Sequence, residues 1–546
     1  MSVARFLLAG GDPDSIFGIS ASTIVDRLFC WLENIGVMGR LSALEGEGVK
    51  REAIPYQMYV ILYFLRCLAR IKSQNTLPDH LFSDLGLMQR VGFNAHDLEY
   101  GVTQRGAGRR EGPRTNLPVD PEAMSRNVVK LSLPAVRDLL RFALRAIWAS
   151  IPEVPSKLLV AVDGSFVEVG ASAKGAGVTS RRKKVWTKAG VQEVTGRVVG
   201  FELVWLWVPA LKLPLAVAFG KAEEDEKKFV PELLEEARRV LGERARIGTL
   251  VEDRGFLSGV DMWALNEAGI RFIVPARRDM RIHEEARRVA QSGSPGWTVH
   301  RQSRTETVPG KKRGEKKQKV TELVGVEGCR TLETYAPSEQ VEDGENRRRY
   351  QKDFAANRLN AVVLVREDGR EEPDLVLLTN GPVGKPFVVF DDYDERSLIE
   401  NQGHRVLKQD WCLESPVQRT AKAAELHVRF VVLAYALMQG YSLWEEGQIE
   451  EEARGRTTTL GQYVRRLERE NLDRILVFVG EEYGIYYTSE FMLLLGRRVL
   501  KFPNPRGAKT AEELLARLER EGEGQERGGP APPSEGGGGP PTGNAG

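Results

Sequence analysis

The feature that most constrains this chain is a pair of short apolar runs that each end in an acidic residue. Residues 247–256 read IGTLVEDRGF, and residues 156–165 read SKLLVAVDGS. Apolar runs of this length predict buried strands, and the glycines that follow Asp163 and Asp253 predict that the strands end there. Because open α/β sheets carry their chemistry at the carboxyl ends of strands, we expect both aspartates at one edge of a sheet.

A third acid, Glu400, lies in a segment that predicts a helix, residues 391–411, with Tyr393 and Arg396 on the same face. Two strand-end aspartates and a helix glutamate suit a pair of divalent cations about 3.5 to 4 Å apart, as in two-metal phosphoryl transfer. Each acid taken alone has a simpler explanation, because such aspartates are usually turn or cap residues and such a glutamate is usually solvated. The hypothesis therefore depends on the three acids together.

Three motifs together resemble the DDE transposases of bacterial insertion sequences. They are Asp163-Gly164-Ser165, Asp253-Arg254-Gly255-Phe256 and Tyr393-x-x-Arg396-x-x-x-Glu400, within roughly residues 158–438. The third motif is the most specific, and it resembles the Tyr-Arg-Glu-Lys signature of the insertion-sequence-4 family. The resemblance implies a cut-and-paste DNA transposase, an endonuclease and strand transferase that recombines DNA at the ends of a mobile element.

The resemblance also implies the metal ligands. Asp163 would bind both ions, and Asp253 and Glu400 would complete one site each, with two Mg²⁺ ions per active site and Mn²⁺ as a substitute. Glu252 is an alternative to Asp253, but neighbouring residues on a strand face opposite sides, and the Asp-Arg-Gly-Phe match favours Asp253. Two histidines have no partner at an i, i+4 spacing and are not expected to be ligands. They are His404 and His427.

Three residues near Glu400 are expected to contact DNA. Tyr393 and Arg396 are placed to hold the phosphate beside the scissile one. In the family the signature lysine follows the glutamate by seven positions, but position 407 is leucine here and the nearest lysine is Lys408. On an ideal α-helix seven steps return to within about 20° of the glutamate, whereas eight leave about 80°. The Lys408 side chain must therefore bend back toward the Glu400 face of the helix to take the role of the signature lysine.

A cationic run precedes the second strand of the core. Residues 174–188 carry six cations in fifteen residues, which indicates either a solvated loop or a hairpin that contacts the DNA backbone beside the first aspartate. The candidate contacts are Arg181, Arg182, Lys183 and Lys184. Trp297 is either a base-stacking residue or a core or hairpin tryptophan. Two further basic clusters lie at residues 311–319 and 347–352.

The predicted element order from residue 158 is three strands, helix, strand, helix, strand and helix, which is the order of an RNase H-like core. Asp253 and Glu400 are 147 positions apart, far more than a structureless loop spans. The intervening sequence predicts strands at residues 322–326, 361–365 and 375–379. We therefore expect an α/β protein with an RNase H-like catalytic core and a β-rich insertion, flanked by helical N- and C-terminal regions.

These patterns divide the chain into six regions. Residues 1–115 form a helical N-terminal region, a candidate for DNA-end binding, with helices expected at 23–32 and 56–65. Residues 116–275 form the first part of the core, led by one long helix at 120–150, and residues 276–384 form the insertion. Residues 385–450 form the second part of the core, residues 451–520 a helical C-terminal region, and residues 521–546 a Gly- and Pro-rich tail expected to be disordered.

Composition sets the remaining limits. The net charge of the 546 residues is only +2, so local basic clusters rather than the whole chain must attract nucleic acid. The four cysteines are far apart without CxxC spacing, which indicates neither a zinc site nor a disulfide framework. No signal peptide and no membrane-length apolar stretch is visible. We expect a cytoplasmic, nucleoid-associated protein without a membrane partner.

The leading hypothesis is a transposase that works as a homodimer or higher oligomer on double-stranded DNA, at the element ends and the target. One alternative is an RNase H-like nuclease that hydrolyses nucleic acid without strand transfer. Another is a catalytically silent DNA-binding protein descended from a transposase. The three acids argue against the silent protein, and the displaced Lys408 keeps that alternative open.

Overall fold

The structure is a computed structural model that describes residues 2–19, 23–48, 54–82, 84–94, 119–187, 190–293, 295–309, 316–329, 358–368, 374–416, 418–446, 474–496, 508 and 510–527. The chain divides into two compact units. One comprises Met1–Thr23, Phe82–Arg90 and Arg465–Gly546, and the other comprises Ile24–Leu81 and Val91–Val464.

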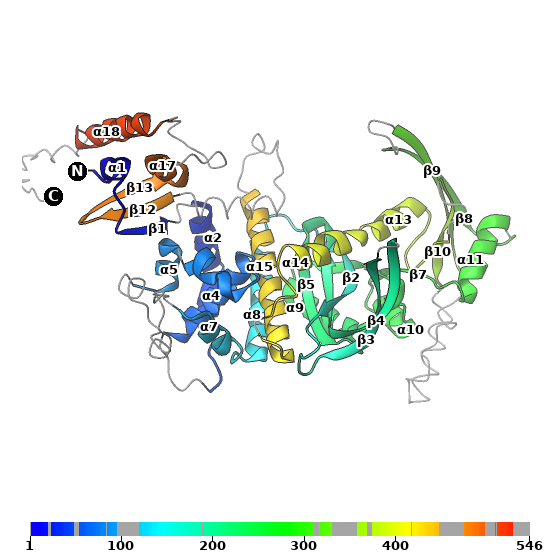
Figure 1. Ribbon diagram of the computed structural model, residues 1–546. Coiled ribbons are helices and arrows are strands. Elements are labelled where there is room, and N and C mark those ends of the chain that lie inside the picture. Colours follow the sequence, from blue (N-terminus) through cyan, green and yellow to red (C-terminus); the bar gives the residue numbers. More distant parts are fainter. Residues whose placement is uncertain are drawn as a thin grey trace, which may run out of the picture. The chain divides into compact units, whose positions relative to one another are not determined.

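A ten-stranded sheet forms the centre of the larger unit (Figure 1). Its strands are β2 (Lys157–Glu168), β3 (Gly177–Thr187), β4 (Gly190–Val208), β5 (Leu213–Lys221), β6 (Arg246–Glu252), β7 (Arg271–Pro275), β8 (Val299–Pro309), β9 (Lys316–Val326), β10 (Asn360–Glu367) and β11 (Val376–Thr379). They follow the order β3-β4-β2-β6-β7-β11-β10-β9-β8, and β5 pairs with β4. The pairs β2–β6 and β6–β7 are parallel, and the others are antiparallel.

The helices of the larger unit pack on the sheet or on one another. They are α2 (Thr23–Asn34), α3 (Val37–Ser42), α4 (Tyr56–Leu68), α7 (Pro121–Val128), α8 (Leu133–Ser150), α9 (Val230–Leu241), α10 (Gly259–Glu267), α11 (Arg281–Ser292), α13 (Pro386–Asp394), α14 (Arg405–Gln409) and α15 (Ala421–Glu446). Helices α8, α9 and α15 pack against β5, and α4 packs on α15. Helix α13 lies across β6, β7, β8, β9 and β10. The middle of α15 is apolar on all sides and buried, as Phe430, Val431 and Leu437 show.

The helices α2 and α4 lie where apolar patterns predicted helices. The segment at 120–150 was expected to be one helix, but it forms α7 and α8. Ser132 is the N-cap residue of α8 and Pro134 lies in its first turn. Proline is favoured there because its missing N–H has no partner to lose, whereas further along a helix it would break the hydrogen-bond ladder.

Strand β2 does not end at Asp163, contrary to the prediction, but continues to Glu168. The glycine after the aspartate suggested a break, yet Gly164 pairs with Val204 of β4 as a regular strand residue. A Cβ at Gly164 would lie 2.5 Å from the carboxylate of Glu226. The glycine therefore leaves room for the Glu226 carboxylate and does not form a turn.

The segment between Asp253 and Glu400 extends the central sheet. Strand β11 pairs with β7, and β10, β9 and β8 follow in turn, so that β8 forms the far edge. The predicted strands correspond to β9, β10 and β11. The long β8–β9 hairpin projects at that edge (Figure 1).

The smaller unit joins the two ends of the chain. It contains β1 (Ser15–Ile19), β12 (Arg474–Val479), β13 (Glu482–Tyr487), α1 (Val3–Leu8), α17 (Thr488–Leu494) and α18 (Ala511–Arg527). Strand β12 lies between β1 and β13, and Val3, Leu7, Val477 and Leu514 share its core. The C-terminal region was expected to be helical, but residues 474–487 form a hairpin because a β-branched and aromatic run turns at Gly480, whose φ is 59°.

Helix α18 continues to Arg527, inside the segment expected to be a disordered tail. Several other expectations lie outside the described residues, namely the rest of that tail, the basic cluster at 347–352 and most of the cluster at 311–319. Among the helices within the described ranges, none is long and apolar enough to cross a membrane.

Candidate active site

Asp163 and Asp253 lie on neighbouring parallel strands. Strands β2 and β6 pair in a register that places Val162 opposite Glu252, and each aspartate is the next residue along its strand direction. Asp163 is mostly buried, with 13% of its side chain exposed. Asp253 directly follows β6 and caps a short 3-10 helix, Arg254–Phe256, accepting a hydrogen bond from the Arg254 backbone N–H at 2.6 Å. Asp253 therefore has the cap role that turn chemistry predicts.

Of the acid pair at the end of β6, Asp253 faces the candidate site. Glu252 is fully buried, and burial followed by the charge of Asp261 raises its pKa to about 8. The charge of Asp253 instead reaches Tyr393 and Arg396. The alternation of side chains along the strand separates the two acids.

Glu400 lies on a π-helical turn, Ile399–His404, rather than on the single helix that was predicted. Helix α13 ends at Asp394, so Tyr393 is in its last turn and Arg396 lies in the turn that follows. The Arg405 backbone N–H donates to the carbonyl oxygen of Glu400, five residues earlier. Such i→i+5 turns hold one residue more than an α-helical turn and occur often at functional sites.

Gly403 allows this turn to approach the sheet. A Cβ at Gly403 would lie 2.7 Å from Cζ2 of Trp205, a side chain of β4 that is fully buried. Because Trp205 pairs with Asp163 across β4 and β2, the glycine brings the Glu400 turn next to the first aspartate.

The Arg396 guanidinium lies among the acids. Its Nη1 is 3.1 Å from Glu400 Oε1 and 4.0 Å from Asp163 Oδ1. Burial alone would lower the pKa of Arg396, but the charges of Tyr393, Asp253, Asp163 and Glu400 raise it above its ordinary value. Arg396 thus connects Asp163 with the π-helical turn, and the charge of Asp253 acts on the same guanidinium.

His404 contacts Asp163 directly. Its Nε2 is 3.4 Å from Asp163 Oδ2 and accepts a hydrogen bond from Trp205 Nε1 at 3.2 Å. In neutral imidazole a nitrogen that accepts a proton carries none of its own. The Trp205 indole therefore fixes the position of the His404 ring beside Asp163. His404 was not expected to take part in the site, although its position four residues after Glu400 places it on the same helical face.

A second pair of acids lies beside Asp163. The Glu226 carboxylate lies over Gly164, and its pKa is raised by burial and by the charge of Asp163. Its neighbour Glu202, on β4, is 2% exposed, and burial together with the charge of Glu226 raises its pKa to about 8. No motif in the sequence indicated either acid, because they come together only through the pairing of β4 with β2.

Two residues expected to bind DNA contact the protein here. Arg181 Nη2 is 3.1 Å from Glu202 Oε2, and its guanidinium lies 4.4 Å from the centre of the Phe166 ring. Lys408 Nζ donates to the Phe166 carbonyl at 2.5 Å and lies 3.4 Å from Glu414 Oε1. Arg181 therefore packs against β2 and β4, and Lys408 packs against the end of β2.

Four predicted DNA contacts remain. Arg182, Lys183 and Lys184 belong to β3, which pairs with β4, so the cationic run is a strand and not a loop. Their side chains lie outside what the structure describes. Trp297 is partly buried just before β8.

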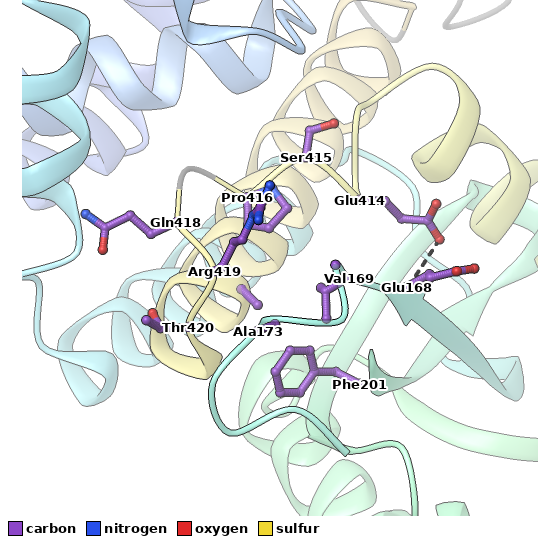
Figure 2. A pocket seen from close by; sticks show the side chains of 12 residues that line it. Glu168, Val169, Ala173, Phe201, Glu414, Ser415, Pro416, Gln418, Arg419 and Thr420 are labelled. Atoms are coloured by element: carbon purple, nitrogen blue, oxygen red, sulfur yellow. Dashed lines mark hydrogen bonds between the residues drawn. The ribbon is translucent and has the colours of Figure 1, made fainter. Parts of the chain in front are cut away.

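A cavity of about 400 Å³ lies beyond the end of β2 (Figure 2). Its lining includes Phe201, Arg419 and two acids, Glu168 and Glu414, and the Glu168 backbone N–H donates to Glu414 Oε1 at 3.5 Å. The paired carboxylates make it a poor site for a DNA phosphate. The acids around Arg396 are the better candidate site.

The oxygen ligands around Asp163 are of the kind that Mg²⁺ prefers. Within the ranges that the structure covers, however, no three Asp, Glu, His or Cys side chains lie close enough together to hold an ion. The residues fit a metal in their chemistry, but in this arrangement the positive charge among them is Arg396.

The segment that carries this site matches a known protein family. Residues 155–437 match the model of the transposase DDE domain, which is more than half of the chain. The chain belongs to this transposase family. No curated protein matches it. Among solved structures it is similar to the piggyBac transposase in a synaptic complex with hairpin DNA, with 11% sequence identity and a TM-score of 0.36 over 90% of this chain and 89% of that chain, which is too low to compare residues.

The family match agrees with the resemblance drawn from the three motifs. It includes Asp163, Asp253 and Glu400 of the transposase, together with the strands and the π-helical turn that carry them. It begins just before β2 and ends within α15.

Proposed function

We propose that this transposase cuts DNA at the ends of an insertion sequence and transfers the cut strands, with Asp163, Asp253 and Glu400 as its catalytic acids. The observation that carries the proposal is that Arg396 lies between Asp163 and Glu400, while the charge of Asp253 from the adjacent parallel strand acts on the same guanidinium. Interacting charged groups that come from three separate segments mark a candidate functional site.

The strand order supports an RNase H-like core. Strands β5, β4 and β2 are antiparallel neighbours, and β6 and β7 continue from β2 in parallel, with α9 and α10 between successive strands. Along the chain, apart from the additional strand β3, these strands and helices follow the predicted order of three strands, helix, strand, helix and strand. In this assignment residues 116–275 and 385–450 form the core, and residues 276–384 are an insertion that widens its sheet.

The π-helical turn supports the insertion-sequence-4 signature. The lysine follows Glu400 by eight positions rather than seven, but the wide turn holds one additional residue. The eight positions from Glu400 to Lys408 therefore place the lysine where seven positions would place it in a regular α-helix. Tyr393, Arg396, Glu400 and Lys408 are therefore proposed as the Tyr-Arg-Glu-Lys set, with Lys408 directed toward β2 through the Phe166 carbonyl.

We assign Asp163 to both ions, and Asp253 and Glu400 to one each, with Mg²⁺ as the natural ion and Mn²⁺ as a substitute. A bound pair of such ions activates the attacking hydroxyl and stabilises the leaving oxygen. The transposase itself positions the carboxylates: Gly403 allows the Glu400 turn to approach β4, and His404, which is hydrogen-bonded to Trp205, lies against Asp163. Arg396 and Tyr393 would hold the phosphate flanking the scissile one.

The partners are proposed to be double-stranded DNA, at element ends and target, and a second copy of the transposase in the DNA complex. The proposed DNA contacts are Arg182, Lys183 and Lys184 of strand β3 in the core, and Trp297 near the β8–β9 hairpin in the insertion. The helices before residue 115 are proposed to bind the element end. The setting would be the cytoplasm, at the nucleoid.

The proposal is tested with labelled DNA that carries the sequences flanking the gene. The parent protein should release a cut end and join it to target DNA when Mg²⁺ or Mn²⁺ is present. Asp163→Asn, Asp253→Asn and Glu400→Gln should each lower cutting by orders of magnitude while DNA binding persists. Cut but unjoined products would favour the RNase H-like nuclease, and parental cutting by any of the three variants would refute its assigned role.

A further inference from the structure

The guanidinium of Arg396 lies where the proposed metal ions would have to bind, beside Asp163 and Glu400. Only 14% of its side chain is exposed, and its Nη1 lies near both Glu400 and Asp163. The charge of Asp253 acts on the same guanidinium. Its Nε is buried and has no hydrogen-bond partner among the residues that the structure describes. The guanidinium is therefore held by charge more than by a complete set of hydrogen bonds.

The acids need this charge in a protein without metal. Carboxylates brought together in a half-buried position repel one another unless a positive charge or a proton lies among them. Arg396 supplies the positive charge, because its Nη1 lies 3.1 Å from Glu400 Oε1 and 4.0 Å from Asp163 Oδ1. In the described part of the chain the acids do not converge into a three-ligand ion site, which agrees with a guanidinium separating them.

We propose that Arg396 is an internal substitute for the divalent cations, which it excludes from the acids until a DNA phosphate draws it away. This inference rests on the proposed function, because it takes Asp163, Asp253 and Glu400 as the metal ligands. A guanidinium binds phosphate through two parallel N–H groups, so the same residue can exchange Glu400 for DNA. Metal and DNA then bind cooperatively, because each favours the state in which Arg396 has left the acids.

If Arg396 exchanges Glu400 for a DNA phosphate, its replacement should have opposite effects on metal binding and on DNA cutting. Removing the positive charge should strengthen metal binding in the DNA-free protein while weakening DNA cutting. We expect Arg396→Gln to bind Mn²⁺ roughly tenfold more tightly than the parent, which corresponds to about 1.4 kcal/mol. Arg396→Lys keeps the charge and should bind Mn²⁺ as the parent does.

The measurement is a Mn²⁺ titration of the DNA-free protein followed by electron paramagnetic resonance of the free ion. Arg271→Gln is the matched control, because Arg271 pairs with Asp392 of α13 at 2.8 Å and not with the three acids. It should leave Mn²⁺ affinity unchanged. Adding a duplex with the DNA that flanks the gene should raise the Mn²⁺ affinity of the parent but not that of Arg396→Gln.

Two outcomes separate this inference from the proposed function. Mn²⁺ affinity in Arg396→Gln that equals or falls below the parental value, in a protein that unfolds at the parental temperature, would overturn the inference alone. If Arg396→Gln does not fold, an unchanged parental affinity after addition of the duplex overturns it. Mn²⁺ binding that is unaffected by Asp163→Asn would overturn both, because the metal site would then lie elsewhere.

Discussion

The Gly403→Ala substitution tests the contact that positions Glu400. The new methyl carbon would lie 2.7 Å from Cζ2 and 3.3 Å from Cη2 of Trp205, and 3.6 Å from Cγ1 of Ile399. Contacts below 3 Å force one partner to move. Trp205 cannot give way easily, because it is fully buried and its indole is hydrogen-bonded to His404. The π-helical turn must therefore move away from β4.

Two effects set the magnitude for stability. Overpacking a dense core costs about 1 to 3 kcal/mol, whereas replacing a helical glycine by alanine returns about 0.5 to 1 kcal/mol. We expect Gly403→Ala to lower the free energy of unfolding by about 1 to 2 kcal/mol. DNA cutting should fall by about a hundredfold, because Glu400 and His404 flank the displaced residue and a shift of about 1 Å at a catalytic group has that effect.

Gly39→Ala provides the matched control. Gly39 lies within α3, and nothing lies within 4 Å of the position that an added methyl carbon would take, so alanine should raise stability by the helix effect alone. Urea unfolding and cleavage of labelled terminal DNA measure the two results. A Gly403→Ala protein that unfolds and cuts like the parent would refute the view that Trp205 and Gly403 fix the Glu400 turn.

Three further predictions concern contacts outside this turn. Burial lowers the pKa of His427 to about 3, so between pH 6.5 and 3 the unfolded chain binds a proton that the native state does not bind. The free energy of unfolding should therefore fall as the pH falls, by up to about 1.4 kcal/mol per pH unit. Urea unfolding at several pH values should show a smaller loss in His427→Gln. Arg304 of β8 donates two hydrogen bonds, of 2.7 and 2.8 Å, to Asp391 of α13. Arg304→Gln should remove about 1 kcal/mol of stability from this contact and so speed amide exchange in the β8–β9 hairpin. Unchanged exchange would contradict a role of Arg304 in holding the hairpin against α13. Replacing Arg182, Lys183 and Lys184 by Ala should flatten the salt dependence of DNA binding by about 0.9 per lost phosphate contact, whereas Arg181→Ala should mainly lower stability.

The sequence predicted the centre of the fold because the signals there are local. The apolar runs before Asp163 and Asp253 identify β2 and β6, and parallel strands at the centre of a sheet are buried on both faces. Adjacent placement of the two aspartates then follows from the register of one strand pair.

The contacts that complete the site could not be predicted in this way. The π-helical turn depends on Gly403 meeting Trp205, and the two residues are far apart in sequence. Glu226 reaches Gly164 only after β4 has paired with β2 and β5 has paired with β4. The continuation of β2 beyond Asp163 was missed because Gly164 indicates a turn as readily as a close approach.

The most direct test of the central claim is the position of Mn²⁺ in crystals of the transposase bound to DNA from the ends flanking its gene, located by anomalous diffraction. The proposed function predicts Mn²⁺ bonded to Asp163, with Asp253 and Glu400 as further ligands and Arg396 turned to a DNA phosphate. Mn²⁺ bound away from Asp163, or Arg396 still paired with Glu400 beside a bound ion, would contradict it.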